Sequence, residues 1–368
     1  MSVKVFVGPG SGTGVRRGAA GNLASTPSTT KKQEESDQSV RRPTIVDVAR
    51  RAGVSVATVS RVIAGRPVAD QELVVRVRSA AVELAYRPNT VARDFRLGLT
   101  SSIGVVVPDL ANPFFPHVLK GLASEVSVGD HRLLVVDSRE DPDEEIRLVE
   151  QLAGRCDGIL LCSPRMSVAN LSAAAGFGIP IICTNRSVDG LPLGTIGIDS
   201  RAGMREAITH LHQLGHRRIG YLAGPESSWS DQRRREGLAT AAAALAVDVH
   251  VTVAGSTSDA GFAALPELLG LGVTAIVAFN DLVAVGALSR LRELEVAVPR
   301  DLSVVGFDDI PFAAFLGPPL TTVSVPKEEL GRQAWAMLHR QMQDGQIAAE
   351  QWLPSSLVVR RSTAPPRH

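Results

Sequence analysis

Residues 44–62 constrain this chain more than any other stretch, because their spacing suits two short helices that cross with almost no room between them. Ala49 is small at the point where the helices touch, and Gly53 can take the positive φ that the turn needs. Thr44 with Asp47, and then Ser55, are natural N-caps for the two helices. The apolar residues that close the core are Ile45, Val48, Ala52, Val54, Val59 and Val62. The pattern predicts a helix-turn-helix, against the alternative of a chance amphipathic helix pair.

A third helix completes the predicted headpiece. Asp70 can cap it, and an apolar stripe continues to about residue 85. The stripe consists of Leu73, Val74, Val77, Ala81 and Leu84. Residues 86–89 end the helix, because they contain a proline. The helical pattern at 90–96 is too short to be stable alone, so we predict a hinge there.

Charge is distributed unevenly along the 368 residues, although the formal net charge is only +1. Residues 41–100 hold 11 basic and 5 acidic side chains, a net charge of +6, whereas residues 101–368 hold 23 and 30, a net of −7. A basic module before an acidic body suits local attraction to phosphate groups without binding of the whole chain to polyanions. The length also predicts two or three domains, a small module and a larger body.

From residue 102 onwards, short apolar strands alternate with helices. In the first half we predict strands at 103–107, 132–136, 158–161 and 179–184, with helices after Phe114 and from Asp143. In the second half we predict strands at 219–222, 249–254, 275–279 and 303–307, with helices at 234–245 and 281–294. This alternation is typical of doubly wound parallel sheets, so we expect an α/β body of two similar halves. A ligand cleft is expected at the carboxyl ends of the strands.

Cysteine usage and hydropathy favour a cytoplasmic chain. The three cysteines, Cys156, Cys162 and Cys183, lie in or near apolar runs, which favours buried free thiols in a reducing cytosol. No His or Cys spacing typical of a metal site occurs, and we expect no metal and no cofactor. No apolar run is long enough to span a bilayer, and the N-terminus lacks the pattern of a secretory signal.

Residues 1–42 are predicted to be a disordered N-terminal extension, because most of this segment is rich in Gly, Ser, Thr and Lys. Four glycines after an apolar run suggest a phosphate loop, but their spacing fits neither common form of that motif. The glycines are Gly8, Gly10, Gly12 and Gly14. We therefore assign this segment no function.

The second helix carries the residues expected to read DNA. It begins after Ser55, so Val56 and Ala57 in its first turn and Arg61 one turn later can face base edges in a major groove. Arg61 can reach a guanine with two hydrogen bonds, whereas the other two offer only apolar contacts. The small donors placed for phosphate oxygens are Thr44, Ser55, Thr58, Ser60 and Asn89. For Thr44 and Ser55, helix capping is an equally good explanation.

Several spaced segments together resemble the lactose/galactose repressor (LacI/GalR) family. Besides the headpiece they are residues 86–89, 103–108, 112–115, 214–219, 280–281, 305–309 and 319–323. The resemblance covers about residues 43–362 and implies a transcription regulator whose two-lobed body is similar to periplasmic sugar-binding proteins. It also implies three crossovers between the lobes, near residues 199–202, 322–325 and 352–355.

The resemblance gives the hinge a role as well. In the family this segment becomes helical only on paired half-sites, where it enters the minor groove and wedges a base step. That role falls on Asn89, Ala92, Arg93, Phe95 and Arg96. The wedge position is usually Leu, whereas this chain has Phe95, a larger apolar group that can still unstack a step.

Polar residues after the body strands are candidates for binding the effector. Arg234, Asn280 and Asp308 of the second half offer the guanidinium, amide and carboxylate groups that orient a polyol. The resemblance places Arg234 at the start of a helix, and capping is an alternative role for Asp308. The other candidates are Phe114, Phe115, Asp137, Asn185 and Trp229. Core packing explains the two phenylalanines equally well, and Trp229 either stacks on a sugar or packs against a helix.

We therefore predict a headpiece at 43–87, a hinge at 88–100 and an effector-binding and dimerisation body at 101–368. The first lobe is expected at about 101–199 and 324–351, and the second at about 200–323 and 352–368. The predicted function is that of a homodimeric, sequence-specific DNA-binding regulator, a repressor, controlled by a small effector such as a sugar. The alternatives are a cytoplasmic or transport-type ligand-binding protein and, third, an enzyme. We find no nucleophile motif, metal cluster or phosphate loop for catalysis.

Overall fold

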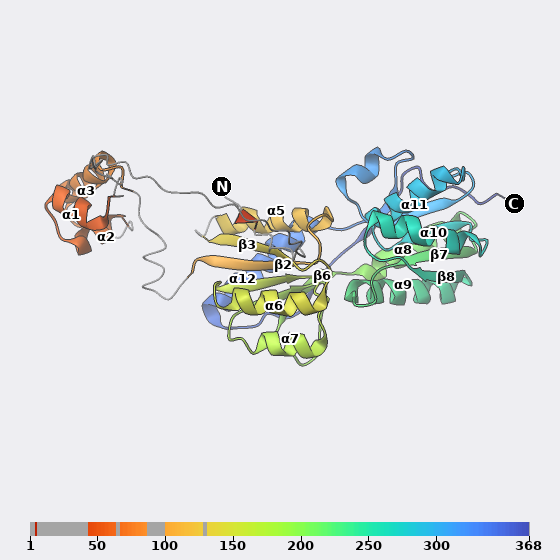
Figure 1. Cartoon of the computed structure of the whole chain (residues 1–368), viewed down its shortest axis with the longest axis horizontal. Coiled ribbons are helices and arrows are strands. Elements are labelled where there is room, and N and C mark those ends of the chain that lie inside the picture. Colours follow the sequence, from red (N-terminus) through yellow and green to blue (C-terminus); the bar gives the residue numbers. More distant parts are fainter. Residues whose placement is uncertain (1–3, 6–42, 64–66, 87–99, 128–130, 368) are drawn as a thin grey trace, which may run out of the picture. The chain divides into compact units, whose positions relative to one another are not determined.

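The computed structural model describes residues 4–5, 43–63, 67–86, 100–127 and 131–367. The chain divides into two compact units, one of residues 9–98 and one of residues 1–8 and 99–368 (Figure 1). The first unit contains the headpiece and the second contains the body. Each unit is described by itself.

The headpiece is the three-helix unit that the sequence predicts. Its helices are α1 (Ile45–Ala52), α2 (Val56–Ile63) and α3 (Gln71–Glu83). Their inner faces share one core, formed by Val48, Ala49, Ala52, Val59, Val62, Val77, Ala80 and Ala81. These apolar residues recur three or four positions apart, so each helix buries one stripe and leaves the opposite face in water.

Local hydrogen bonds fix the ends of the headpiece helices. Thr44 and Asp47 form the predicted capping box at α1, with 2.9 Å between the Thr44 amide nitrogen and the Asp47 carboxylate. Gly53 ends α1 at φ 66°, in the left-handed region that favours glycine. Asp70 caps α3 through the Leu73 amide. The helix-turn-helix is therefore confirmed, together with the reasons that predicted it.

The first lobe of the body is built around a seven-stranded sheet of order β1-β3-β2-β4-β5-β6-β12. Its strands are β1 (Lys4–Val5), β2 (Ser102–Val107), β3 (Arg132–Asp137), β4 (Gly158–Cys162), β5 (Ile181–Thr184), β6 (Gly194–Ile198) and β12 (Gln351–Leu353). Its helices are α5 (Phe114–Val126), α6 (Pro142–Ala153), α7 (Val168–Ala175) and α12 (Lys327–Asp344). In Figure 1, α5 and α6 cover opposite faces of this sheet. Both faces are buried, which explains the continuous apolar runs of the strands.

The second lobe repeats this plan with a six-stranded sheet of order β13-β11-β10-β9-β7-β8. Its strands are β7 (Arg218–Ala223), β8 (Asp248–Val253), β9 (Ala275–Ala278), β10 (Ser303–Asp308), β11 (Thr321–Ser324) and β13 (Ser356–Val358). Its helices are α8 (Ser200–Gln213), α9 (Trp229–Leu245), α10 (Ser258–Leu269), α11 (Asp281–Glu293) and the 3-10 helix η2 (Pro311–Phe315). Tyr221 packs towards α8 and α9, whereas Leu222 packs towards α10 and α11, as the alternation of a strand requires.

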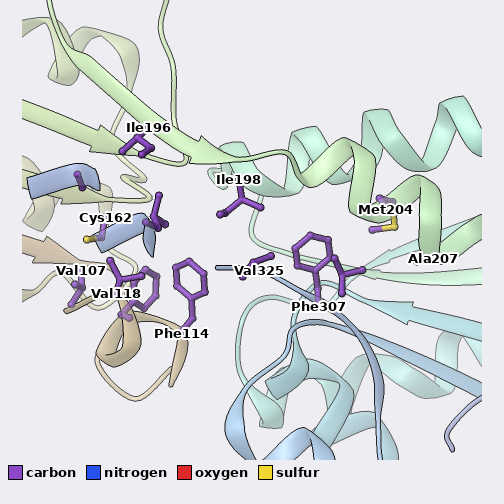
Figure 2. Close-up of a cluster of buried hydrophobic side chains, with 14 of the residues drawn as sticks. Val107, Phe114, Val118, Cys162, Ile196, Ile198, Met204, Ala207, Phe307 and Val325 are labelled. Carbon is purple, nitrogen blue, oxygen red and sulfur yellow. The ribbon is translucent and has the colours of Figure 1, made fainter. Parts of the chain in front are cut away.

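Three crossovers join the lobes, and an apolar core runs between them. The chain passes from β6 to α8, from β11 to α12 and from β12 to β13, at the three places that the resemblance implies. Figure 2 shows Phe114 of the first lobe and Phe307 of the second, with Ile198 and Val325 of two crossovers between them. The crossovers are thus packed against both lobes. The two-lobed α/β architecture is confirmed.

Several boundaries differ from the predicted ones. Helix α9 begins at Trp229, five positions before Arg234, because Ser228 caps it through the Asp231 amide. At the junctions predicted at about residues 324 and 352, Ser324 pairs with Asp308 in the second sheet, and Trp352 pairs with Gly197 in the first. Lys4 and Val5, in the extension predicted to be disordered, form β1 beside β3.

Candidate DNA-reading helix and effector cleft

Helix α2 presents to solvent the side chains that the sequence assigns to base contacts. Val56, Ala57 and Arg61 are exposed, whereas Val59 and Val62 on the opposite face are buried. Within the residues that the structure describes, the Arg61 side chain forms no hydrogen bond or ion pair. Its guanidinium group is therefore available for a ligand. This face combines one strong donor with two small apolar groups, the composition expected of a major-groove reader.

The hydroxyl groups near α2 act first as caps. The Ser55 hydroxyl accepts a hydrogen bond from the Thr58 amide at 3.1 Å, and the Ser55 and Thr58 hydroxyl oxygens lie 2.9 Å apart. Ser60 is exposed and Thr44 is committed to the capping box. A hydroxyl can accept from an amide and still donate to a phosphate oxygen, so capping and phosphate contact are compatible. The predicted contacts Asn89, Ala92, Arg93, Phe95 and Arg96 lie outside the described residues.

The first-lobe wall of the cleft is built at the carboxyl ends of the strands. It is formed by Asn112, Phe114, Phe115, Glu140, Ser163, Arg165 and Asn185. The rings of Phe114 and Phe115 meet edge to face, 5.2 Å apart. Glu140 and Arg165 form an ion pair with 2.5 Å between the Glu140 Oε2 and Arg165 Nε atoms, and a second hydrogen bond of 3.2 Å makes it bidentate. This wall therefore combines an aromatic corner with a neutralised charge pair.

The second-lobe wall is formed by Ser230, Arg234, Ser256, Phe279, Asn280 and Asp308. Asn280 caps α11 through the Val283 amide at 2.8 Å and donates to the Ser256 carbonyl at 2.9 Å. Its amide is thereby fixed in orientation at the edge of the cleft. The three predicted residues of this lobe, Arg234, Asn280 and Asp308, come together as the strand-end argument expects.

Arg234 is held between two aromatic rings and one carboxylate. Its guanidinium carbon lies 3.7 Å from the centre of the Phe307 ring and 4.6 Å from that of Phe279. One terminal nitrogen donates to the Phe279 carbonyl, and the other pairs with Asp308 at 3.3 Å. Stacking and pairing together compensate for burial of the charge, since Arg234 is only 6% exposed. The Nε atom is buried and has no hydrogen-bond partner among the described residues.

Burial also controls the ionisation of the acidic groups behind this wall. It raises the pKa of Asp308 to about 6, although Arg234 and Lys327 act in the opposite direction. Asp281 lies deeper, where it accepts hydrogen bonds from Thr322 and the Ile310 amide, and burial raises its pKa to about 8. A ligand that replaces lost hydration at Asp308 would favour its charged form.

Strained backbone marks the strand ends that line the cleft. Glu140, Ser163, Asn185 and Asp308 all have positive φ values, of 58°, 49°, 53° and 105°. Non-glycine residues rarely adopt this region, and such residues cluster at ligand sites, where packing maintains the strain. All four line the same cavity. Positive φ at the ends of strands from both lobes is thus a feature of the cleft that the backbone alone shows.

Two of the residues predicted to contact the effector do not line the cleft. Asp137 does not line the cleft, because its carboxylate is used at the end of β3 to accept from the Leu110 and Arg139 amides, at 2.9 and 2.7 Å. Trp229 lies outside the cleft too, stacked on Trp352 at a ring-centre distance of 5.3 Å. The Asp137 carboxylate is captured by one amide of its own turn and one of the loop after β2, and the Trp229 ring lines a different cavity.

Sequence reasoning missed Glu140, Arg165 and five further residues of the cleft. The five are Asn112, Ser163, Ser230, Ser256 and Phe279. A usable signal existed for most of them, since they follow the ends of apolar strands. The sequence does not show which residue after each strand faces the cleft, because the loops after the strands differ in length and conformation.

Other classes of site receive little support. Within the described residues, no cluster of three or more His, Cys, Asp and Glu residues could hold a metal ion. Cys156, Cys162 and Cys183 are free and buried, and burial raises the pKa of each thiol to about 12. Such thiols are poor nucleophiles. Among the described helices, none is long and apolar enough to cross a membrane.

Comparisons with known proteins agree with this architecture. Residues 44–89 match the model of bacterial regulatory proteins of the lacI family, and residues 208–363 match a periplasmic binding protein-like domain. The HTH-type transcriptional repressor CytR of Escherichia coli strain K12 is 33% identical over 343 residues, which span 90% of this chain and 98% of CytR. The HTH-type transcriptional regulator GalR of the same strain is 35% identical over 79% of this chain and 87% of GalR.

Solved structures show the same fold. A structure of the lac repressor dimer bound to operator and the anti-inducer ONPF superposes with a TM-score of 0.81 at 29% identity, covering 88% of this chain and 100% of that one. A complex of the transcriptional regulator CelR with cellobiose gives a TM-score of 0.66 at 31% identity, covering 87% of this chain and 100% of the other. The chain therefore belongs to the lacI family of bacterial regulatory proteins and is a DNA-binding transcriptional regulator.

Proposed function

We propose that this chain is a cytoplasmic repressor that binds paired operator half-sites as a homodimer and changes its affinity for DNA when an uncharged carbohydrate binds in the cleft. The observation that carries the proposal is that one chain has both an exposed reading face on α2 and a narrow polar cleft in the body. The proposal assigns the chain no catalytic role. The base contacts fall to Val56, Ala57 and Arg61, and the ligand contacts to the cleft residues of both lobes.

A homodimer is supported by geometry and by exposed apolar surface. One headpiece covers little DNA, and two related headpieces read two half-sites. The body leaves large apolar side chains in water, among them Phe315 at 87% exposure and Phe312 on η2, and Val251 and Val253 on the edge strand β8. Exposed apolar side chains of this size are candidates for a protein interface. The related lac repressor is a dimer on its operator.

The closed state of the cleft indicates how a ligand acts. The cavity encloses only about 30 Å³, enough for about one water molecule. A sugar therefore enters only when the lobes separate, and it favours whichever lobe angle gives it the better contacts. The crossovers bear the change because they are the only segments of chain that join the lobes within the described residues, and two of them contribute Ile198 and Val325 to the apolar core. Coupling to DNA follows if that angle also sets the spacing of the two headpieces.

Charge pairing in the cleft favours an uncharged ligand. Arg165 is paired with Glu140, and Arg234 with Asp308, so neither guanidinium group among the lining residues is available to a phosphate without loss of an ion pair. Hydroxyl and amide groups from both lobes supply the donors and acceptors for sugar hydroxyls: Ser163, Ser230, Ser256 and Asn112. The relatives CelR and an Enterococcus faecium regulator were solved with cellobiose and ribose.

The proposal is tested with matched ligands. Titration calorimetry with ribose and ribose 5-phosphate, and with glucose and glucose 6-phosphate, is expected to show at least tenfold tighter binding of an uncharged sugar. Glu140→Gln releases Arg165 from its partner, so this variant is expected to gain affinity for the phosphorylated member of the pair. Glu293→Gln, which breaks an exposed ion pair with Arg290, is the control and should change neither affinity.

Two results would contradict the proposal in different ways. Tighter binding of a phosphorylated sugar by the unmodified chain would overturn the charge argument and leave the cleft as the ligand site. If Arg234→Ala bound every sugar as tightly as the unmodified chain, the cleft itself would be the wrong site. The effect on DNA is then read by titrating labelled operator with and without the sugar that binds.

A further inference from the structure

A second cavity lies beside the crossover from β6 to α8. Its volume is about 330 Å³, against about 30 Å³ for the cleft, and the two share no lining residue. Ile198 and Ser200 also line the small recess next to Arg234, so the two spaces are neighbours. We call this space the tryptophan cavity, because Trp229 and Trp352 are in its wall. Its size is within the range of small-molecule sites.

The aromatic wall of the tryptophan cavity is made by both lobes. Trp229 is the first residue of α9 in the second lobe, and Trp352 is in β12 of the first. Their rings are stacked, with centres 5.3 Å apart and planes 14° from parallel, and the Arg233 guanidinium carbon lies 4.3 Å from the centre of the Trp229 ring. Trp352 nevertheless remains 40% exposed. A partly exposed indole at the rim of a cavity offers an apolar contact surface to a ring-shaped ligand.

Hydrogen-bonding groups of both kinds surround this wall. Carboxylates come from Asp189, Asp199 and Glu350, and guanidinium groups from Arg201 and Arg233. Both guanidinium groups are anchored by one acid outside the cavity, Glu236, at 2.6 Å from Arg201 and 2.8 Å from Arg233. The Arg233 Nε atom is buried without a hydrogen-bond partner among the described residues. A ligand acceptor at that position would satisfy it.

The chemistry of these groups selects the ligand. A hydroxyl group donates to a carboxylate and accepts from a guanidinium group, so a polyol satisfies both sets. The carboxylates outnumber the guanidinium groups, which disfavours phosphates and other anions. From this arrangement we infer that the tryptophan cavity is a second ligand site, for an uncharged polyol of monosaccharide or disaccharide size. Because both lobes contribute walls, occupation of this site changes with the lobe angle and so with the state of the cleft.

The test separates this site from the cleft. In Arg234→Ala, which removes a cleft contact, glucose, maltose, cellobiose and glycerol are titrated by calorimetry and by tryptophan fluorescence. The chain has three tryptophans, two of which form the stack, so binding here should change the emission. At least one polyol is expected to bind this variant. Adding Trp352→Ala should weaken that binding tenfold or more, and Asp189→Asn should weaken it severalfold, whereas Asp259→Asn, an exposed carboxylate of α10, should not.

The inference is overturned if Arg234→Ala binds none of the four polyols. It is also overturned if the bound polyol is unaffected by both Trp352→Ala and Asp189→Asn. Asp189→Asn keeps the size of the side chain, so it remains informative where loss of the indole destabilises the lobe. If the single substitution Arg234→Ala abolishes sugar binding, the cleft is supported as the ligand site and the tryptophan cavity is rejected as a second one. The two proposals therefore fail separately.

Discussion

Arg234 shows how one residue combines structural and ligand-binding roles. Its position depends on α9, whose first turn is fixed by Asp231: this carboxylate accepts from the Tyr221 hydroxyl at 2.6 Å and the Gly224 amide at 2.8 Å. Three residues later, Arg234 reaches back to the Phe279 carbonyl and Asp308. The sequence predicted the chemistry of Arg234 and Asp308, and the structure adds that they neutralise each other.

At the residue scale, Arg61 is expected to provide the polar part of base recognition. Arg61→Ala should remove discrimination at one operator position, worth about 1–3 kcal/mol for a bidentate contact to guanine. The measurement is binding to a set of operators that differ at single positions. Arg76→Ala, on α3, removes the same charge and should leave the base preference unchanged. A profile of Arg61→Ala identical to that of the unmodified chain would assign readout to other residues.

At the scale of elements, short-range rules explain the headpiece and leave the cleft loops undetermined. The α1–α2 turn follows from Gly53, and the start of α9 follows from Ser228, which is hydrogen-bonded to a neighbour three positions away. The β3–α6 loop is different, because Asp137 at its start accepts a hydrogen bond from the Leu110 amide of another loop, and Glu140 in the same loop lines the cleft. That contact lies far along the chain, so no local pattern reports it.

The turn between α1 and α2 provides a prediction at this scale. Gly53→Ala places a side chain at φ 66°, where nothing within 4 Å obstructs it, so the cost is conformational and about 1 kcal/mol. Gly53→Asn should cost less, because asparagine tolerates this region better than alanine. Hydrogen exchange of the α1 and α2 amides in the full-length chain measures both. Equal protection in the two variants would mean that the turn relaxes to another conformation.

At the scale of the whole molecule, buried carboxyl groups make stability depend on pH. Burial raises the pKa of Glu145 to about 7 and that of Asp281 to about 8, both well above their ordinary values. These two groups therefore hold more protons in the folded chain than in the unfolded chain between about pH 4 and pH 8. The stability that these two carboxyl groups contribute is fully present below the pKa values that they have in the unfolded chain. It is lost as pH rises through the pKa values that they have in the folded chain. The contribution of Glu145 and Asp281 to the free energy of unfolding should accordingly fall as pH rises from about 5 to 8.

Glu145→Gln tests this dependence. Glu145 accepts from the Arg165 and Met166 amides, each at 2.7 Å, and a glutamine oxygen can keep one or both hydrogen bonds without titrating. Arg165 and Arg186, which lower the pKa of Glu145, are unchanged. The variant should lose less of its melting temperature between pH 5 and pH 8 than the unmodified chain does. Glu150→Gln, an exposed neighbour on α6, is the control, and an equal flattening there would refute the assignment.

The amino-acid sequence by itself determined the helix-turn-helix, the alternation of strands and helices, and the edge of the sheets where polar residues gather. These features depend on side-chain periodicity and capping within about ten residues, which a linear pattern records. Only the tertiary structure decided that Glu140 and Arg165 belong to the cleft, that Asp137 does not, and that Trp229 meets Trp352 beside a second cavity. The contacts of Glu140, Arg165 and Asp137 join loops that follow different strands of the first lobe, and the stack of Trp229 on Trp352 joins the two lobes, so none of them is recorded in a local pattern.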